Sequence, residues 1–159
     1  MRFTQALLKD MKVQAIEEKA DDLFLSWHVH IFHLNSRKHI IFINDLSRLC
    51  ILISGVRTGQ LNLLKEKFLE TMKSYLEYEE ISKTQIENYL KHGTDICISK
   101  TNSRSVLATM TEITIFDTDD FDNDLERMKW LNRLIYKPIN YNKPIEVFTE
   151  QLEKINSLF

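Results

Sequence analysis

Residues 26–53 read SWHVHIFHLNSRKHIIFINDLSRLCILI, and this stretch decides the fold class. Apolar and polar side chains alternate from Ser26 to Leu34, which is the period of a half-buried β-strand. Two further apolar runs, 39–44 and 49–53, are rich in β-branched residues and are bounded by polar turns. Both are apolar on each face, as strands covered on both sides are. The stretch therefore predicts three consecutive strands of an antiparallel sheet.

Helical periodicity surrounds this β-rich stretch. It is clearest at 5–19, 60–79, 103–116 and 145–157. A short apolar run at 95–99 predicts a fourth strand. The fold class that follows is α+β, with a small, mainly antiparallel sheet packed with about five helices. The strands are expected near 26–34, 39–44, 49–53 and 95–99.

The size and composition of the chain favour one compact unit. Its 159 residues, 43% hydrophobic and 28% charged, are typical of a globular protein with a substantial core. With only 3 glycines and 2 prolines, the chain is expected to contain no flexible linker. We predict a single domain over 1–159 that ends in an extended arm at 137–144 and a C-terminal helix at 145–157.

Charge, cysteine content and the first residues restrict the class of protein. The formal net charge of −2 argues against general nucleic-acid binding. No apolar segment typical of a signal peptide follows Met1, and the longest apolar runs are too short to cross a bilayer. Cys50 and Cys97 lie in apolar runs and are expected to be buried free thiols. We therefore expect a cytoplasmic protein outside the membrane, and we predict no cofactor.

Residues 100–107, KTNSRSVL, have the makeup of an anion site. They lie where the strand at 95–99 is expected to lead into the helix at 103–116. The first N–H groups of a helix have no partner within it, and the helix dipole favours negative charge there. Cationic and small polar side chains accompany these donors. The candidate ligand-binding residues of this run are Lys100, Asn102, Ser103 and Arg104.

Hairpin geometry points to a second polar group. If residues 35–38 form the loop, paired positions sum to 73, and His28 lies opposite Asp45. The same register places His30 opposite Ile43. A carboxylate beside an imidazole fixes its tautomer, as general base catalysis requires, so His28 and Asp45 are candidate catalytic residues. A structural hydrogen bond at the edge of the sheet is the alternative.

A metal site is another use of these side chains. His28 and His30 lie on the same side of the predicted strand, and Asp45 would be a third ligand. Two histidines and one carboxylate form the ligand set of several metal centres. Spacing alone does not establish ligand geometry. We therefore predict no metal and keep this set as the alternative.

Three blocks of sequence, taken in order, resemble a known family. They are SWH at 26–28, INDLSR at 43–48 and KTNSRSVLATM at 100–110, with further similarity at 131–133 and 144–148. The family consists of small bacterial proteins and is catalogued as a domain of unknown function. The resemblance implies a family and a bacterial origin, but no activity. The chain departs from the family pattern at Ala108 and at His30, and the second departure weakens the metal alternative.

The polar residues of these blocks coincide with the candidates above. Asn44 ends the second predicted strand, and Asp45 and Arg48 follow it. Together with Arg104 these residues would form a cleft suited to phosphate or carboxylate. Our leading hypothesis is a cytoplasmic binding protein with an anion-accepting cleft for a nucleotide or another phosphorylated ligand. Asn44 and Arg48 join the ligand-binding candidates of 100–107. An ion-pair network that only stabilises the fold is the alternative.

Two other classes of function fit the sequence. A metal-independent, RNase-like enzyme would use His28 as general acid or base and an arginine to stabilise the transition state. A protein-interaction module, antitoxin-like or an anti-defence partner, would use the apolar stripe of 145–157 and the arm at 137–144. Self-association through the same helix is a further alternative.

Overall fold

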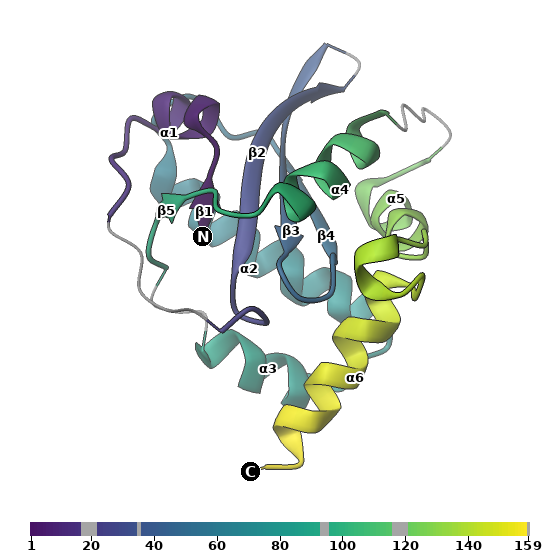
Figure 1. Ribbon diagram of the computed structural model, residues 1–159. Helices are drawn as coiled ribbons and strands as arrows, with labels where there is room; N and C mark the ends of the chain where they lie inside the picture. Colours follow the sequence, from purple (N-terminus) through teal and green to yellow (C-terminus); the bar gives the residue numbers. More distant parts are fainter. Residues whose placement is uncertain (17–21, 35, 93–95, 116–120, 159) are drawn as a thin grey trace.

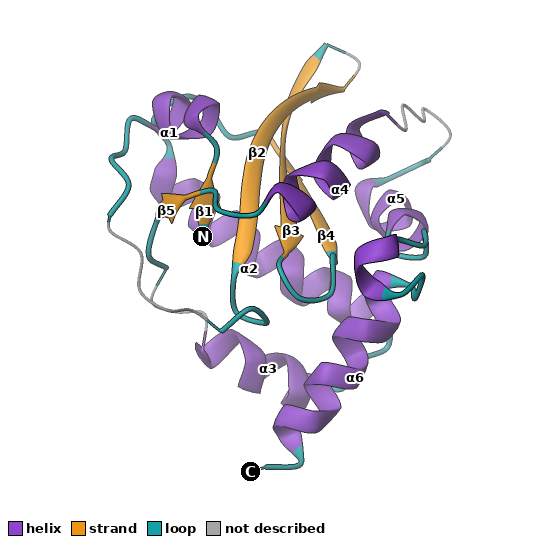
Figure 2. Cartoon of the chain, in the orientation of Figure 1, coloured by secondary structure: helices purple, strands orange, loops and turns teal. Residues whose placement is uncertain are grey.

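One sheet of five strands organises the structure. The computed structural model describes residues 1–16, 22–34, 36–92, 96–115 and 121–158. Within these residues the strands lie in the order β4–β3–β2–β1–β5 (Figure 2). Their bounds are Arg2–Phe3 for β1, Trp27–Leu34 for β2, Arg37–Asn44 for β3, Cys50–Ser54 for β4 and Ser99–Lys100 for β5. The pairs β2–β3 and β3–β4 are antiparallel, whereas β1 is parallel to both β2 and β5.

The α+β class is confirmed, but the sheet is mixed rather than mainly antiparallel. The sequence pattern does not predict β1, because a strand of two residues has no detectable period. The strand expected at 95–99 is wrong in its extent: only Ser99–Lys100 pairs with β1, and residue 95 lies outside the described residues. The short parallel strands β1 and β5 therefore form one end of the sheet.

Six α-helices and one 3-10 helix of the described residues surround the sheet (Figure 1). The α-helices are α1 Gln5–Met11, α2 Leu61–Tyr78, α3 Lys83–His92, α4 Arg104–Ile115, α5 Asp124–Leu131 and α6 Pro144–Asn156, and the 3-10 helix η1 is Lys137–Ile139. None of the described helices is long and apolar enough to cross a membrane.

Two segments differ from the sequence prediction. The helix expected at 5–19 ends at Met11, because Lys12 takes the left-handed conformation (φ 53°) that commonly terminates a helix. Residues 17–19 of that prediction lie outside the described part of the chain. The expected extended arm at 137–144 is wrong, since η1 and the first residue of α6 fall within it. Buried Ile139 anchors η1 to the protein, so this segment is compact.

The helices cover both faces of the sheet. α2 packs on one face, where the ring of Phe68 lies 5.2 Å from that of Trp27 on β2 and 4.5 Å from that of Phe42 on β3. α4 crosses the opposite face over β2 and β3 (Figure 1). The two-sided burial predicted for the central strands follows from this arrangement.

The apolar stripe of α6 belongs to the core of the chain. Ile145, Phe148 and Leu152 are buried. The ring of Phe148 packs 4.8 Å from that of Phe24 and 5.2 Å from that of Tyr89 on α3. The stripe is therefore already covered and does not form the exposed surface that the interaction hypothesis required.

α5 and the residue after it cover the free edge of β4. The side-chain amide of Asn132 accepts from the Cys50 N–H (2.7 Å) and donates to the Cys50 carbonyl (2.9 Å). The N–H of Leu52 points to the Met128 sulfur at 3.4 Å. Cys50 is buried as expected, but Cys97 is exposed, because β5 begins only at residue 99. The outer edge of β4 thus finds its hydrogen-bond partners on α5 and on the residue that follows α5.

The hairpin β2–β3 has a register two residues away from the predicted one. Leu34 pairs with Arg37, so paired positions sum to 71, and Ile43 rather than Asp45 lies opposite His28. The N–H of Asp45 donates to the Ser26 carbonyl at 2.9 Å, just beyond the ladder. A shift of two residues keeps side chains on the same face, so Asp45 becomes the diagonal neighbour of His28.

Candidate functional site

His28 and Asp45 form a buried hydrogen bond. Nδ1 of His28 lies 2.7 Å from Oδ1 of Asp45, and the two side chains are 0% and 3% exposed. β2 supplies the histidine, and the turn between β3 and β4 supplies the aspartate. The structure therefore brings together the two residues that the sequence predicted as a catalytic pair, through a diagonal contact.

The second nitrogen of His28 holds the start of α4. Its Nε2 accepts hydrogen bonds from the backbone N–H groups of Asn102 (3.2 Å) and Ser103 (3.3 Å). Nδ1 therefore carries the proton and donates a hydrogen bond to the Asp45 carboxylate. Since both nitrogens are engaged and the side chain is fully buried, this geometry offers no support for His28 as a general acid or base.

Asn44 builds the turn that carries Asp45 and Arg48. Its Oδ1 accepts from the N–H groups of Leu46 (3.2 Å) and Ser47 (3.0 Å), and its Nδ2 donates to the Phe24 carbonyl at 2.9 Å. Its side chain is fully buried. An amide with these partners stabilises a tight turn. Asn44, predicted to bind ligand, is thus enclosed by the backbone that it organises.

Two arginines approach Asp45 from different sides. Nε of Arg2 lies 3.5 Å from Oδ2 of Asp45, and both side chains are buried. Arg48 instead donates through Nη1 to the main-chain carbonyl of Asp45. The carboxylate therefore faces His28 and Arg2. Sequence reasoning missed Arg2 because the two-residue strand β1 leaves no periodic signal.

Arg48 is a buried cation with no carboxylate of its own within the described residues. It is 7% exposed, its Nη2 donates to Oγ of Ser105 at 3.0 Å, and its Nε has no hydrogen-bond partner in the described structure. Burial lowers the pKa of Arg48, and the charge of Asp45 offsets this only in part. A buried guanidinium in this state is a natural partner for an anion.

The first turn of α4 presents further donors. Ser103 Oγ accepts the N–H of Val106 at 3.3 Å, but in the described structure the N–H groups of Arg104 and Ser105 have no hydrogen-bond partner. The exposed Arg104 side chain likewise forms no hydrogen bond or ion pair with a described residue. These N–H groups and Arg104 belong to the helix turn that Arg48 contacts through Ser105, and backbone donors beside arginines are the chemistry of an anion site.

Lys100 does not join this group. β5 pairs Ser99 with Arg2 and Lys100 with Phe3, so Ser99 shares the face of Arg2 and Lys100 lies on the opposite face. Asn102 contributes its N–H to His28, and its side chain is exposed. Of the residues predicted for one anion site in 100–107, Lys100 therefore lies apart from those at the start of α4.

The metal alternative is not assembled. Nδ1 of His30 lies 2.8 Å from Oγ1 of Thr4, and both nitrogens of His28 have partners. Among the residues described, no three His, Cys, Asp or Glu side chains gather as a metal site. His28, His30 and Asp45 are thus not arranged as one ligand set.

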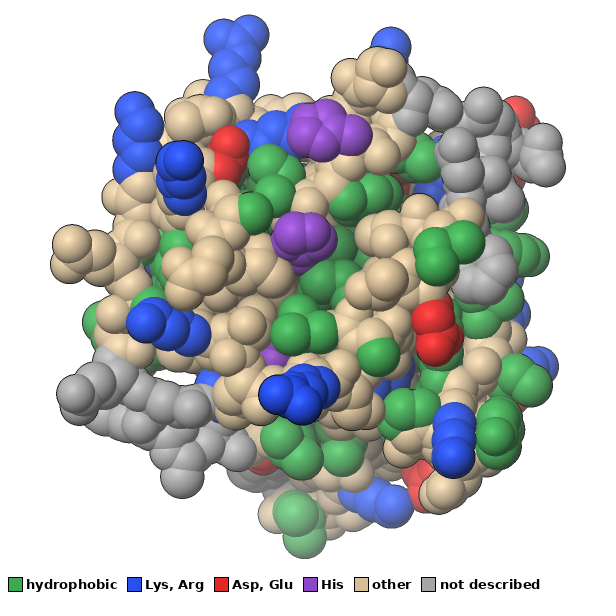
Figure 3. All heavy atoms as spheres, turned by 45° about the horizontal axis from the view of Figure 1, so that its top comes forward, with side chains coloured by type: hydrophobic (Ala, Val, Ile, Leu, Met, Phe, Trp, Pro, Cys, Tyr) green, Lys and Arg blue, Asp and Glu red, His purple; other side chains and the backbone are tan. Residues whose placement is uncertain are grey.

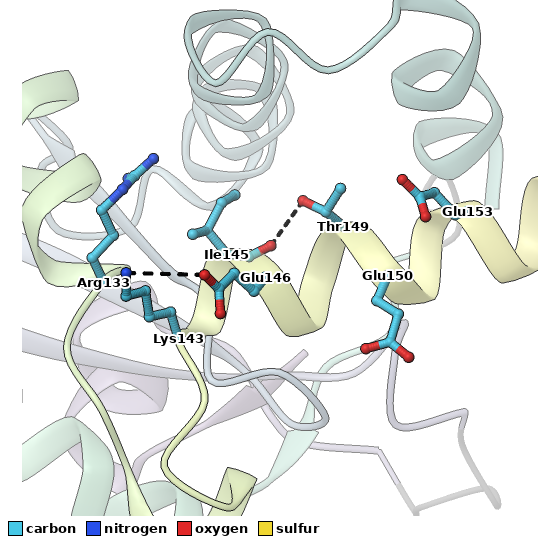
Figure 4. Close-up of a pocket in the computed structure, with 7 residues that line it drawn as sticks. All are labelled: Arg133, Lys143, Ile145, Glu146, Thr149, Glu150 and Glu153. Carbon is cyan, nitrogen blue, oxygen red and sulfur yellow. Dashed lines mark hydrogen bonds and ion pairs between the residues drawn. The ribbon is translucent and has the colours of Figure 1, made fainter.

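A hollow of about 420 Å³ beside α6 has a different character (Figure 4). It is lined by Arg133, Lys143, Ile145, Glu146, Thr149, Glu150 and Glu153. Arg133 binds the Glu79 carboxylate at 2.6 Å, and Lys143 lies 3.9 Å from Glu146. Because its cations already face carboxylates, this hollow is poorly suited to an anion.

Comparison with known proteins places the chain in a family. A family model described as a domain of unknown function (DUF6933) matches residues 1–147. The chain is a DUF6933 protein. No curated protein matches it significantly. The predicted membership of a family of unknown function is confirmed, and the residues that the DUF6933 model matches include His28, Asp45, Arg48 and all of α4.

Proposed function

We propose that this DUF6933 protein binds a phosphate group, or a similar anion of a phosphorylated compound, at the first turn of α4. The binding groups are the guanidinium of Arg48, the side chain of Arg104 and the N–H groups of Arg104 and Ser105. The observation that carries the proposal is the state of Arg48, which is buried, has no described carboxylate partner and has an unused N–H.

The geometry of Arg48 explains why the anion is expected at α4. Nε and Nη2 form one edge of the guanidinium, and Nη2 already contacts Ser105 Oγ in the first turn. A phosphate oxygen can accept from such an edge in a two-point contact. The dipole of this 12-residue helix adds to the attraction. The anion would supply a negative charge to Arg48, because the Asp45 carboxylate contacts His28 and Arg2.

The test is a titration with inorganic phosphate and with AMP, followed by ¹H–¹⁵N NMR. We expect shifts of the Arg104 and Ser105 amide signals. One charge-assisted hydrogen bond contributes about 1.5–3 kcal/mol, so Arg104→Ala should weaken binding by about tenfold or more while the protein stays folded. Lys73→Ala is the matched control, because Lys73 is exposed on α2 across the sheet.

The variant Arg48→Lys tests whether the Nε and Nη2 edge of the Arg48 guanidinium is needed for binding. It keeps the charge but loses the two-point geometry, so binding should weaken although the net charge is unchanged. Absence of amide shifts at α4, or equal affinity for the wild type and Arg104→Ala, would show that the cluster of arginines only stabilises the fold.

A further inference from the structure

A second hollow lies at the other end of the sheet, between α1 and β5. Its volume is about 620 Å³. It is lined by Gln5, Leu8, Lys9, Lys12, Val13, Gln14, Ala15 and Lys100. Lys100 contributes from β5, and the other residues come from α1 and the segment that follows it. The hollow is separate from the Arg48 site, because Lys100 and Ser99 lie on opposite faces of β5.

The charges of this hollow are all of one sign among its lining residues. Lys9, Lys12 and Lys100 are exposed, and none forms a hydrogen bond or ion pair through its side chain within the described structure. Asp10 on α1 does not neutralise them, since its carboxylate binds Lys38 (2.5 Å) and Thr58 (3.0 Å). Figure 3 shows several Lys and Arg side chains on the left of the top face, over α1.

Main-chain hydrogen bonds fix the backbone at Lys12 and in the segment that follows it. Lys12 has the left-handed backbone conformation in which glycine is the usual residue. Its side chain passes close to Gly59: the Lys12 Cδ lies 3.8 Å from the point where a Cβ on Gly59 would be. Its own N–H and that of Val13 bond to carbonyls of α1, and the N–H of Ile16 bonds to the Ile98 carbonyl beside β5. These main-chain bonds attach the segment after α1 to α1 itself and to the chain just before β5.

The surface between the lysines is partly apolar. Leu8 is 7% exposed, and Val13 and Ala15 are partly buried. An inorganic anion would use only the ammonium groups, whereas an organic anion would also cover this apolar surface.

We infer that this hollow is a second binding site, for an organic phosphate or phosphonate with an apolar body. Lys9, Lys12 and Lys100 bind the anionic group, and the organic part packs on Leu8, Val13 and Ala15. The site is independent of the proposed α4 site.

The experiment uses 1-naphthyl phosphate, inorganic phosphate and uncharged 1-naphthol, each titrated into the intact protein and followed by NMR. Amide signals of Lys9 to Ala15 and of Lys100 report this site, whereas those of Arg104 and Ser105 report the other. We expect 1-naphthyl phosphate to shift the first group with an affinity about tenfold or more above that of phosphate, because it buries apolar surface. 1-Naphthol should shift it weakly.

Two variants test the lysines. Lys12→Gly removes the ammonium and suits the left-handed backbone, and Lys100→Gln removes the charge on β5. Each should weaken 1-naphthyl phosphate binding about threefold to fivefold, as expected for one exposed ion pair. Lys73→Gln on α2 is the control of equal charge change. Equal binding of 1-naphthol, equal affinity for inorganic phosphate, or unchanged binding by both variants would overturn the inference.

Discussion

The imidazole of His28 and the carboxylate of Asp45 meet at 2.7 Å although strand pairing places Ile43 opposite His28. The contact crosses the end of the hairpin, where Asp45 has left the ladder. Through Nε2 the same imidazole also binds the residues that open α4. One buried side chain thus connects β2, the β3–β4 turn and α4.

Asp45→Asn should strongly destabilise the protein. The change keeps the size of the side chain but removes the negative charge that faces the buried Arg2 at 3.5 Å and accepts the hydrogen bond of His28. Breaking a buried ion pair costs about 3–5 kcal/mol, so we expect a loss of about 3 kcal/mol in the free energy of unfolding, measured in urea. Asp124→Asn, which removes a half-exposed partner of Arg127, should cost less than about 1 kcal/mol. Similar losses in the two variants would contradict this account.

His28→Leu should loosen the start of α4. The variant leaves the N–H groups of Asn102 and Ser103 without their acceptor, at about 1–3 kcal/mol for each group that stays buried. We expect a loss of about 3 kcal/mol by urea denaturation and faster hydrogen exchange of these two amides. His33→Leu, at an exposed position near the end of β2, should change stability by less than about 0.5 kcal/mol. Unchanged exchange at Asn102 would refute the role of Nε2.

Asn132→Leu should open the edge of β4. It removes both hydrogen bonds to the Cys50 backbone, so a buried N–H and a buried carbonyl lose their partners. We expect a loss of about 2–4 kcal/mol and concentration-dependent association in light scattering, because uncovered edge strands pair with other chains. Asn142→Leu adds the same apolar side chain at an exposed position and should remain monodisperse if burial of the edge is the cause.

Acid stability should depend on Glu79. Burial alone would raise its pKa, but hydrogen bonds from Arg133 and Tyr75 outweigh burial and lower the pKa below the ordinary value of 4.5. The folded state therefore binds this proton less readily than the unfolded state. The stabilisation is present above about pH 4.5 and is lost as the pH falls through the folded pKa.

Glu79→Gln tests this directly. The variant should be less stable than the wild type at neutral pH, and the difference should shrink as the pH falls below 4.5 in thermal unfolding scans. Glu77→Gln, which removes the charge of an exposed carboxylate near the end of α2, is the control and should change stability by less than about 0.5 kcal/mol at pH 7. A difference between wild type and Glu79→Gln that stays constant from pH 7 to pH 3 would argue against the ion pair.

The two thiols should react very differently. Burial raises the pKa of Cys50, whereas Cys97 is exposed. Titration of the native protein with a thiol reagent should modify one cysteine rapidly, and Cys97→Ser should abolish that fast phase. Fast modification of two thiols in the native state would show that β4 opens readily.

Several parts of the site could be predicted from the sequence. The strands at 26–34 and 39–44 follow from alternation and β-branched runs, and their connection through a short turn constrains which faces meet. Because an error of two residues in the register preserves the face, His28 and Asp45 were correctly brought together from the wrong pairing. Helix termini also carry local signals, so the start of α4 at Arg104 was close to its expected position.

The sequence by itself determined the local periods, and with them the α+β class, the β2–β3 hairpin and the identity of the polar residues near its end. Only the tertiary structure decided which of these residues meet. The pairing of β5 with β1 places Lys100 on the face opposite Arg2 and Ser99, apart from Arg48. The packing of α6 on Phe24 buries the apolar stripe of α6. The N–H groups of Asn102 and Ser103, predicted to bind an anion, donate to His28 instead. The reason is physical: side-chain period is a local property, whereas a partner distant in the chain is selected by how whole faces pack.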